Sequence, residues 1–399
     1  MQLLLGSKLI NVNMSDTYDR AMFSGAQKVM SLILTIFNAI AYIIGGAFGQ
    51  TSELGIANAS YIFLQLVFAG LVIILLDELL QKGWGIGSGI SLFIAAGVAG
   101  QIFWNSFSFI EAPDPKRLPR GIVIAFFTVL FDNNPNTGIE DIFIRGQLPS
   151  LLGIITTVII FLIVIWFEST RVEIPLQYKG YKGFKGKYPI KLLYVSNIPV
   201  ILVNALYANF LFFGQLIAGP NSTLRNPNTD FWLNLIGTFK SQEEGGGMGN
   251  YLTPTGGLLY LLSPPQGINE LIANPFRAVI YLFIFILLCI YLGKVWVDVS
   301  GLSPKDIAQQ ILDSGMQVPG FRSSEKIIER ILKRYIPTLV ILNGIIIAVL
   351  SFFADSLGAL TSGTGLLISI GIIHQYAESI SKEVAAAQYP SMRQMLGID

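Results

Sequence analysis

The sequence predicts an all-α membrane protein that crosses the bilayer several times. Of the 399 residues, 52% are hydrophobic and only 13% are charged, whereas a soluble protein carries about 25% charged residues. The apolar residues also gather in long windows without charges, and a bilayer core about 30 Å thick needs roughly 20 such residues in a helix to cross it. These observations favour one membrane bundle over a set of soluble domains.

Eight charge-free windows are long enough to be considered as spans. In chain order they cover residues 29–52, 54–76, 83–110, 146–167, 192–224, 278–293, 335–354 and 356–377. The sixth is short, so we expect Arg277 and Lys294 at its ends to extend their charged groups to the membrane interfaces. The third and eighth contain many Gly and Ser residues, which is typical of helices that face protein rather than lipid.

The basic residues are distributed unevenly between the two sides of the predicted membrane. The chain has 26 Lys and Arg against 25 Asp and Glu. If the spans alternate in direction, 19 of the basic residues fall in one set of loops and seven in the other. Because cytosolic loops are enriched in Lys and Arg, the first set is predicted to be cytosolic, together with both chain ends. Residues 1–10 are apolar but too short to cross, and we expect them to be the end of a further span.

Two of the predicted cytosolic loops are strongly basic. Residues 171–191 contain five lysines interleaved with Gly, Tyr and Phe, and residues 324–337 combine an apolar helical face with four basic residues. Cations and aromatic rings together suit phosphate groups. Two interpretations stay open: the loops are basic only because they are cytosolic, or they form a docking surface for a polyanion.

No catalytic constellation is visible. The single His374 and the single Cys289 both lie within predicted spans, and no metal-ligand spacing occurs, so we expect no enzymatic activity, no metal and no cofactor. Three amides, Asn38, Asn204 and Asn209, also lie inside spans, where a polar group is costly unless it is paired or hydrated. They either link helices by hydrogen bonds or line an aqueous path.

Five stretches of the chain closely resemble one membrane protein family. These are residues 75–97, 171–202, 294–311, 320–337 and 363–378, which resemble the SecY subunit of the Sec protein translocon in its archaeal type, with the eukaryotic homologue of the endoplasmic reticulum as the nearest alternative. The resemblance implies an inverted-repeat bundle of ten helices around a pore with a lateral gate, a design akin to other inverted-repeat membrane proteins.

Within that fold, the resemblance implies that this chain holds helices three to ten and lacks the first helix and the plug. Residues 1–110 are then the remainder of the N-terminal half, with the end of helix two and helices three to five. Residues 111–145 are an external loop, and residues 146–399 are the C-terminal half with helices six to ten.

The function implied by the resemblance is a passive protein-conducting channel, driven by a docked ribosome. Secretory proteins would cross through it, and membrane proteins would leave it laterally. The implied partners are the SecE or gamma subunit, a small beta subunit, the ribosome through its RNA, signal sequences, nascent polypeptides and lipid. The implied location is the plasma membrane with a cytosolic C-terminus, or the endoplasmic reticulum if the chain is eukaryotic.

The resemblance also assigns roles to single residues. The pore ring matches Ile90, Ile94, Ile201 and Ile368, the lateral gate matches Asn38 and Asn209, and the ribosome-docking positions are Lys182 and Arg322 with the neighbouring Lys179 and Lys185. Ile90 and Ile94 are one helical turn apart and share a face, and an aliphatic collar can block ions by dewetting. From the residues alone, ordinary core packing is the alternative for each isoleucine.

Two other classes of protein fit part of the pattern. A secondary transporter would also have inverted repeats, glycine-broken helices and polar residues at the midplane, and it would take up a small solute saturably. Its coupling carboxylate is hard to find, because Asp77, Glu78 and Asp355 all lie near predicted helix ends. A membrane scaffold without a conduit would leave the basic cytosolic loops unexplained.

Overall fold

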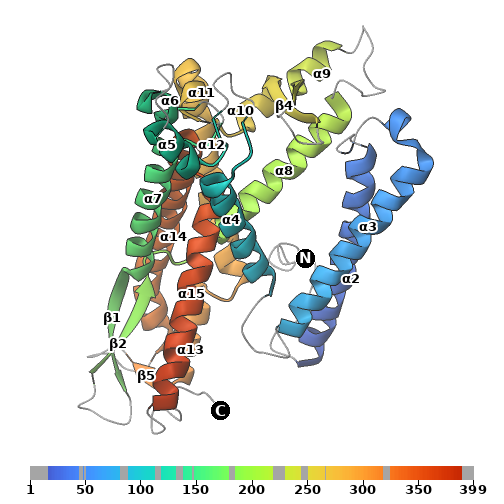
Figure 1. Cartoon of the computed structure of the whole chain (residues 1–399). Coiled ribbons are helices and arrows are strands. Elements are labelled where there is room, and N and C mark those ends of the chain that lie inside the picture. Colours follow the sequence, from blue (N-terminus) through green and yellow to red (C-terminus); the bar gives the residue numbers. More distant parts are fainter. Residues whose placement is uncertain are drawn as a thin grey trace.

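The structure is a computed structural model, and it describes residues 17–44, 48, 51–80, 89–112, 118–131, 138–145, 148–178, 185–218, 230–243, 250–265, 267–317 and 324–388. Within these residues, eight long helices form a bundle (Figure 1). They are α2 (Thr17–Ile44), α3 (Thr51–Leu79), α4 (Gly89–Phe107), α7 (Leu151–Ser169), α8 (Ile198–Ala218), α12 (Pro275–Val299), α14 (Glu325–Ser356) and α15 (Gly363–Gln388).

Each of the eight predicted spans coincides with one of these helices. In the described part of the chain, seven helices are long and apolar enough to cross a membrane by length and composition, and α15 is the long helix outside that set. The polar residues of α15, among them His374 in the eighth window and Glu378 directly after it, explain the difference. The predicted start of the third span, residues 83–88, lies outside the described residues, as does the apolar segment 1–10.

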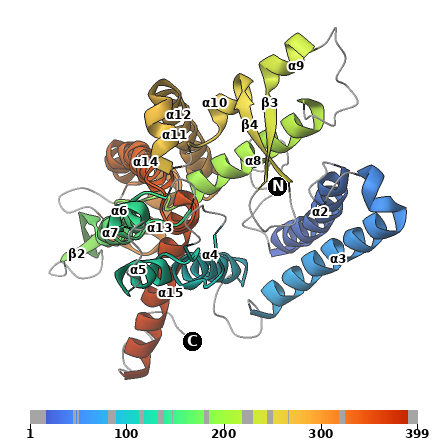
Figure 2. The ribbon, with the colours of Figure 1, turned by 45° about the horizontal axis from the view of Figure 1, so that its top comes forward.

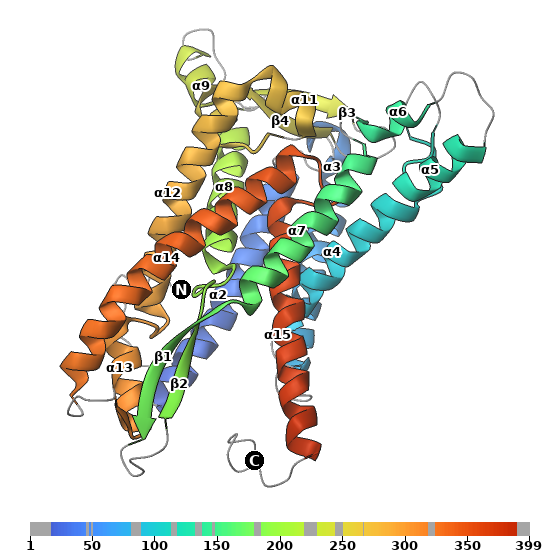
Figure 3. The ribbon, with the colours of Figure 1, turned by 90° about the vertical axis from the view of Figure 1, so that its left-hand side faces the viewer.

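The shorter elements collect at the two ends of the bundle (Figure 3). One end carries the hairpin of β1 (Arg171–Tyr178) and β2 (Lys185–Lys191), followed along the chain by α13 (Pro304–Asp313) and β5 (Met316–Gln317). The other end carries α5 (Ile122–Phe131), α6 (Ile139–Phe143), α9 (Asp230–Ile236), β3 (Thr238–Glu243), β4 (Asn250–Gly256), α10 (Gly257–Leu262) and α11 (Gly267–Ala273). The segments at each end belong to one of the two loop sets separated by charge, so the predicted alternation of spans is confirmed.

At the basic end, a small sheet joins the two predicted cytosolic loops. Its strand order is β2-β1-β5, and both pairings are antiparallel. β1 pairs along its length with β2, while Gln177 and Tyr178 at its far end pair with Gln317 and Met316 of the second loop. The two loops lie far apart in the sequence, and the pairing of β1 with β5 joins them.

The C-terminal half, which we call the C-terminal bundle, consists of α7, α8, α12, α14 and α15 around two apolar cores. The membrane core centres on Phe285, which is fully buried and lies 5.4 Å from Tyr281 between ring centroids. The second core lies under the sheet and includes Ile190, Ile307 and Leu332. The amphipathic segment 324–337 and the seventh span form one helix, α14, which continues through Pro337. This helix contributes residues to both cores.

The N-terminal hairpin, α2 and α3, stands apart from this bundle (Figure 2). Its two helices pack closely on each other, since a Cβ atom on Gly70 would lie 2.5 Å from Thr35 Cγ2. An ion pair of 2.8 Å joins Lys28 Nζ to Glu78 Oε1. The hairpin therefore holds together through its own contacts.

Two features of the end opposite the sheet differ from the sequence prediction. The segment 111–145, predicted as a loop, includes the apolar helix α5, in which Ile122 and Ala125 are fully buried. Arg277, expected to extend its charge to the interface, is instead held by the protein: its side chain is 6% exposed, stacks over the Tyr260 ring at 3.6 Å and pairs with Glu270. Lys294, at the other end of α12, is exposed as predicted.

Candidate functional site

The relative position of α4 and α15 follows from three contacts between them. Asn105 Nδ2 donates to the Leu360 carbonyl at 2.7 Å, and Thr361 Oγ1 donates to Gln101 Oε1 at 2.8 Å. One turn further, a Cβ atom on Gly365 would lie 3.2 Å from Val98 Cγ2. The residue numbers fall along α4 as they rise along α15, so the two helices are antiparallel.

Continuing this register places two predicted ring residues at one level. Ile94 lies four residues before Val98, or about 6 Å along α4, and Ile368 lies three residues after Gly365, or about 4.5 Å along α15. Ile94 and Ile368 are therefore neighbours in height. Ile90 lies one turn closer to the sheet end of the bundle.

The third helix of the predicted ring, α8, is joined to α15 at nearly the same level. Asn197, directly before α8, donates from Nδ2 to the Leu367 carbonyl at 2.6 Å, and Leu367 adjoins Ile368. Ile201 follows Asn197 by four residues, about 6 Å along the helix. Because α8 and α15 run in opposite directions, these offsets place Ile94, Ile201 and Ile368 within about 9 Å of each other in height, or about two helical turns.

The exposure of these side chains separates them from the ordinary core. Ile90, Ile94 and Ile201 are 47%, 38% and 37% exposed. Val200, next to Ile201, is fully buried. Core packing, the alternative interpretation of these isoleucines, therefore fails for Ile90, Ile94 and Ile201, while Ile368 is partly buried.

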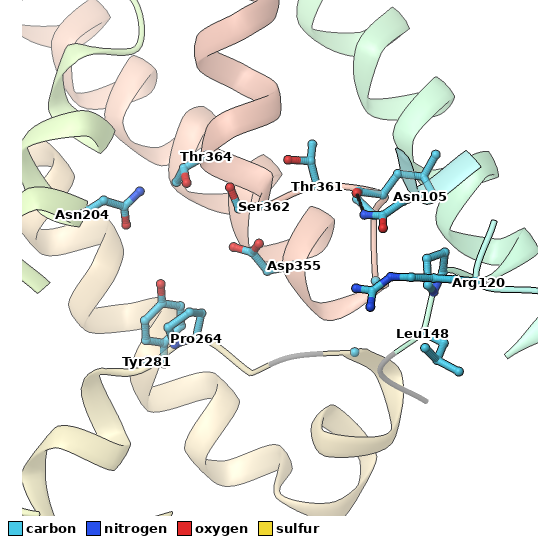
Figure 4. A pocket seen from close by; sticks show the side chains of 15 residues that line it. Asn105, Arg120, Leu148, Asn204, Pro264, Tyr281, Asp355, Thr361, Ser362 and Thr364 are labelled. Carbon is cyan, nitrogen blue, oxygen red and sulfur yellow. Dashed lines mark hydrogen bonds between the residues drawn. The ribbon is translucent and has the colours of Figure 1, made fainter. Parts of the chain in front are cut away.

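A polar cavity of about 340 Å³ begins one turn beyond the predicted ring, on the side away from the sheet. Asn204 of α8 and Thr364 of α15 line it, and these lie three residues after Ile201 and four before Ile368 (Figure 4). The polar lining is completed by Asn105, Arg120, Tyr281, Asp355, Thr361 and Ser362. The position of Asn204 supports the interpretation that the amides inside the spans line an aqueous path.

Asp355 is one of the three carboxylates considered for ion coupling in a transporter. Its Oδ1 accepts a hydrogen bond from the Gly363 backbone N–H at 2.7 Å, at the first residue of α15. The N–H groups of a first helical turn lack partners within the helix, so this carboxylate caps α15. The contact gives Asp355 a structural role in the turn between α14 and α15.

The two predicted gate residues lie on neighbouring helices. The rings of Tyr42 on α2 and Phe212 on α8 have centroids 6.0 Å apart. Asn38 precedes Tyr42 by four residues and Asn209 precedes Phe212 by three, so in two helices that run the same way these amides lie at similar heights. Both side chains are exposed, and Asn209 Nδ2 donates to the Ala205 carbonyl of its own helix at 2.7 Å.

The predicted docking residues are described only in part. Lys179, Lys182 and Arg322 lie outside the described residues, and Lys185 begins β2. Nearby, Lys326, Arg330, Lys333 and Arg334 are exposed at the start of α14, as the sequence predicts. The surface is stiffened by Tyr194, whose hydroxyl donates to the Leu302 carbonyl at 2.7 Å. Burial raises the pKa of Tyr194 above its ordinary value, so the phenol remains a donor.

Sequence reasoning missed the polar contacts at the sheet end of α7 and α15. Glu168 is 3% exposed and accepts a hydrogen bond from Ser196 Oγ at 3.2 Å. Glu378 forms ion pairs with Arg171 and Lys191, and His374 Nδ1 lies 3.9 Å from the same carboxylate. The available signal was an acidic residue at the end of each helix, close to a strongly basic loop. Among the residues that the structure describes, no group of three or more His, Cys, Asp or Glu side chains is arranged to hold a metal ion.

Comparison with known proteins gives one consistent result. The family model described as SecY matches residues 1–377. A curated relative, the protein transport protein Sec61 subunit alpha of Dictyostelium discoideum, is 40% identical over 385 residues, which cover 96% of this chain and 78% of the relative.

Solved structures agree with these matches. A SecY structure concerned with how the plug domain stabilises the closed state of the translocation channel and maintains a membrane seal has a TM-score of 0.73 and 37% identity, over 96% of this chain and 79% of that one. A structure of a protein conducting channel has the same TM-score and identity, over 96% and 78%. Sec61 in the canine ribosome-channel complex from the endoplasmic reticulum gives 0.70 and 37%, also over 96% and 78%.

Proposed function

This chain belongs to the SecY family and is a subunit of a protein-conducting channel in a membrane, and from this premise we propose where the polypeptide passes. The path runs between α4, α8 and α15, with Ile90, Ile94, Ile201 and Ile368 as its constriction. The observation that carries this proposal is that Ile94, Ile201 and Ile368, on three different helices, lie within about two helical turns in height, next to a polar cavity.

The chemistry of such a constriction suits a conduit for polypeptides. Aliphatic side chains offer ions no ligands in place of their hydration shell, so a narrow aliphatic collar excludes ions by dewetting. The same side chains form no hydrogen bonds that a passing chain would have to break. The polar cavity beyond the ring then supplies hydrogen-bonding groups to the emerging backbone, which would otherwise be left without partners.

A lateral exit fits the contact between α2 and α8. We propose that signal sequences enter between these helices and that membrane segments leave there for the lipid. Asn38 and Asn209 support this role, since both amides are exposed at similar heights and water or a signal sequence can satisfy them. The contact between Tyr42 and Phe212 closes one end of this seam.

We propose that a docked ribosome drives the polypeptide through the channel. The sheet supports this docking, because it joins the two basic loops over a core that β2 shares with α14, and both Lys187 of β2 and the basic residues of α14 are exposed. Lys179, Lys182, Lys185 and Arg322 are proposed to contact ribosomal RNA, for which clustered cations are the expected footprint. The canine ribosome-channel complex supports the same partner. The chain itself is proposed to perform no hydrolysis.

Other partners and the location follow from the family. We propose a SecE or gamma subunit and a small beta subunit as further components of the channel. The sheet end and the C-terminus are proposed to be cytosolic because the basic residues concentrate there. The proposed location is the plasma membrane, and the endoplasmic reticulum is the alternative that the canine structure supports.

An ion-leak measurement tests the path. Ile94, Ile201 and Ile368 are replaced together by alanine in the channel complex, which is then reconstituted into lipid vesicles. A wider and less apolar constriction should raise the resting ion conductance by about tenfold or more, since dewetting depends on a narrow apolar passage. The matched control replaces Ile155, Ile159 and Leu162 on the exposed face of α7. Equal conductance of the ring variant and the control variant would reject the proposed path.

A further inference from the structure

The turn between β2 and α8 is fixed to three other helices by polar contacts. Besides the bond from Asn197 to the Leu367 carbonyl of α15, Asn343 Nδ2 of α14 donates to the Ser196 carbonyl at 3.2 Å. Ser196 Oγ in turn donates to Glu168 of α7 at 3.2 Å. Asn197 is 5% exposed and Asn343 is fully buried. Hydrogen bonds at such buried positions are expensive to lose, so this turn has a defined place against the bundle.

The backbone of the same turn is held in an unusual conformation. Ser196 has a φ of 53°, in the left-handed region, and is the one non-glycine residue with positive φ in the described part of the chain. Such a conformation persists when the surrounding structure determines it. On α15, a Cβ atom added to Gly371 would collide with Asn197 Nδ2. The absence of that atom lets the turn lie directly on the helix.

A second attachment lies at the base of the β1–β2 hairpin. Glu378 of α15 accepts from Arg171 Nη2 at 2.7 Å and from Lys191 Nζ at 3.0 Å. Arg171 and Lys191 are directly opposed in the register of the hairpin. One carboxylate of α15 therefore holds the first residue of β1 and the last residue of β2 at once.

These attachments lead to the helices of the predicted ring. Ile201 follows Asn197 by four residues on α8, and Ile368 follows Leu367 directly on α15. Along α15, Glu378 lies ten residues beyond Ile368, or about 15 Å. A displacement of the hairpin thus reaches α8 through the chain and reaches α15 through Glu378.

We propose that Glu378 is a positioning residue that couples the β1–β2 hairpin to the pore helices, so that a load on the hairpin shifts α8 and α15 together. The proposal rests on the proposed function, in which this hairpin meets the ribosome. Glu378 touches neither the polypeptide nor the ribosome in this account. Its effect is a coupling between two sites, and such couplings commonly amount to 5–150-fold.

The chain offers a matched control for this proposal. Glu173 of β1 pairs with Lys187 of β2, so its ion pair stays within the hairpin. Both Glu378→Gln and Glu173→Gln remove one carboxylate charge at nearly constant volume. The first weakens the attachment of the hairpin to α15, and the second leaves that attachment intact. A charge exchange, Lys191→Glu with Glu378→Lys, restores an ion pair at the original place.

The first experiment separates docking from response in the reconstituted channel complex. It measures the affinity for ribosomes carrying a nascent chain and the rise in ion conductance when they bind. For Glu378→Gln we expect an affinity within about twofold of the parent and a conductance rise reduced at least about fivefold. Glu173→Gln should respond like the parent, and the charge exchange should recover most of the response.

Other outcomes overturn the proposal. A normal conductance rise in Glu378→Gln removes the coupling role. A loss of ribosome affinity and of response together means that Glu378 only maintains the fold of the docking surface. An equal loss in Glu173→Gln means that the charge matters and the attachment does not.

A second measurement does not depend on ribosomes. Spin labels at Pro189 of β2 and Ile380 of α15, both exposed, report the distance between hairpin and helix after the buried Cys289 is replaced by alanine. Glu378→Gln should broaden the distance distribution, whereas Glu173→Gln should leave it unchanged. An unchanged distribution in Glu378→Gln overturns the coupling. If the parent channel binds no ribosomes, the docking proposal fails, and this distance still decides on Glu378.

Discussion

The N-terminal hairpin and the C-terminal bundle differ in how they are held, although α3 of the hairpin and α14 of the bundle are about equally apolar. None of the residues in the apolar stretch of α3 is buried, whereas half of those in the apolar stretch of α14 are. In the bundle, α14 packs so closely on α12 that a Cβ atom on Gly344 would lie 3.1 Å from the Ile290 backbone nitrogen. The hairpin meets α8 of that bundle through the rings of Tyr42 and Phe212.

The difference shows where such a channel can move. Lipid is as apolar as a leucine side chain, so hydrophobicity alone does not bind one membrane helix to another, and close packing and polar contacts must do so. The bundle has both, whereas the hairpin, which packs closely only within itself, meets α8 through the ring contact of Tyr42 and Phe212. The seam between α2 and α8 is therefore expected to open at lower cost than the seam between α12 and α14, as the proposed lateral exit requires.

The largest effect is expected for a truncation inside the bundle. Phe285 is fully buried and lies within 6.1 Å of the Tyr207 ring centroid, so Phe285→Ala should lower the free energy of unfolding by about 3–5 kcal/mol through the cavity it leaves. Ile40→Ala on α2, where the side chain is 43% exposed, should cost less than about 1 kcal/mol. Denaturation in detergent micelles compares the two. Similar losses would contradict the contrast between the regions.

A covalent link across the seam should have the next largest effect. Cysteines replacing Tyr42 and Phe212, joined by a short bismaleimide in a background with Cys289→Ala, would tie α2 to α8. We expect protein translocation into vesicles to fall about tenfold, because the seam can no longer part. Cysteines replacing the exposed pair Lys28 and Glu78, linked in the same way within the N-terminal hairpin, serve as the control. Full translocation by the seam-linked channel would show that the exit lies elsewhere.

The smallest effect is expected for the ion pair inside the N-terminal hairpin of α2 and α3. Lys28 and Glu78 are 45% and 34% exposed, and exposed ion pairs contribute about 0–1 kcal/mol because solvent screens them. Lys28→Gln should therefore change the midpoint of thermal unfolding by no more than a few degrees and leave translocation unaltered. A loss as large as that of Phe285→Ala would mean that the hairpin depends on this pair.

Much of the fold could be predicted from the sequence because crossing a membrane leaves a strong signal. All eight windows became helices, and alternating the spans grouped the short elements into the two sets that the structure places at opposite ends. The boundaries were harder: α14 begins ten residues before the window 335–354 because its amphipathic first turns pack under the sheet. The strands β1 and β2 were missed because lysine and glycine rarely indicate a strand.

The candidate site residues were predicted through the resemblance, and local sequence patterns alone do not indicate them. A hydrophobic window does not reveal that Ile201 is exposed while Val200 is buried, since both are aliphatic residues of one helix. The attachment of Glu378 to Arg171 and Lys191 joins segments about 200 residues apart, and no local pattern reports it. Register between α4 and α15 depends on the contacts of Asn105 and Gln101, which only the folded chain brings together.

The central claim is that a polypeptide passes the ring of Ile94, Ile201 and Ile368. A photoreactive amino acid placed at each of these positions, in a channel holding an arrested translocating chain, tests it directly. We predict cross-links to that chain from all three positions and none from Ile155 or Ile159 on the exposed face of α7. Cross-links from α7 in place of the ring, or equal yields from both, would contradict the account.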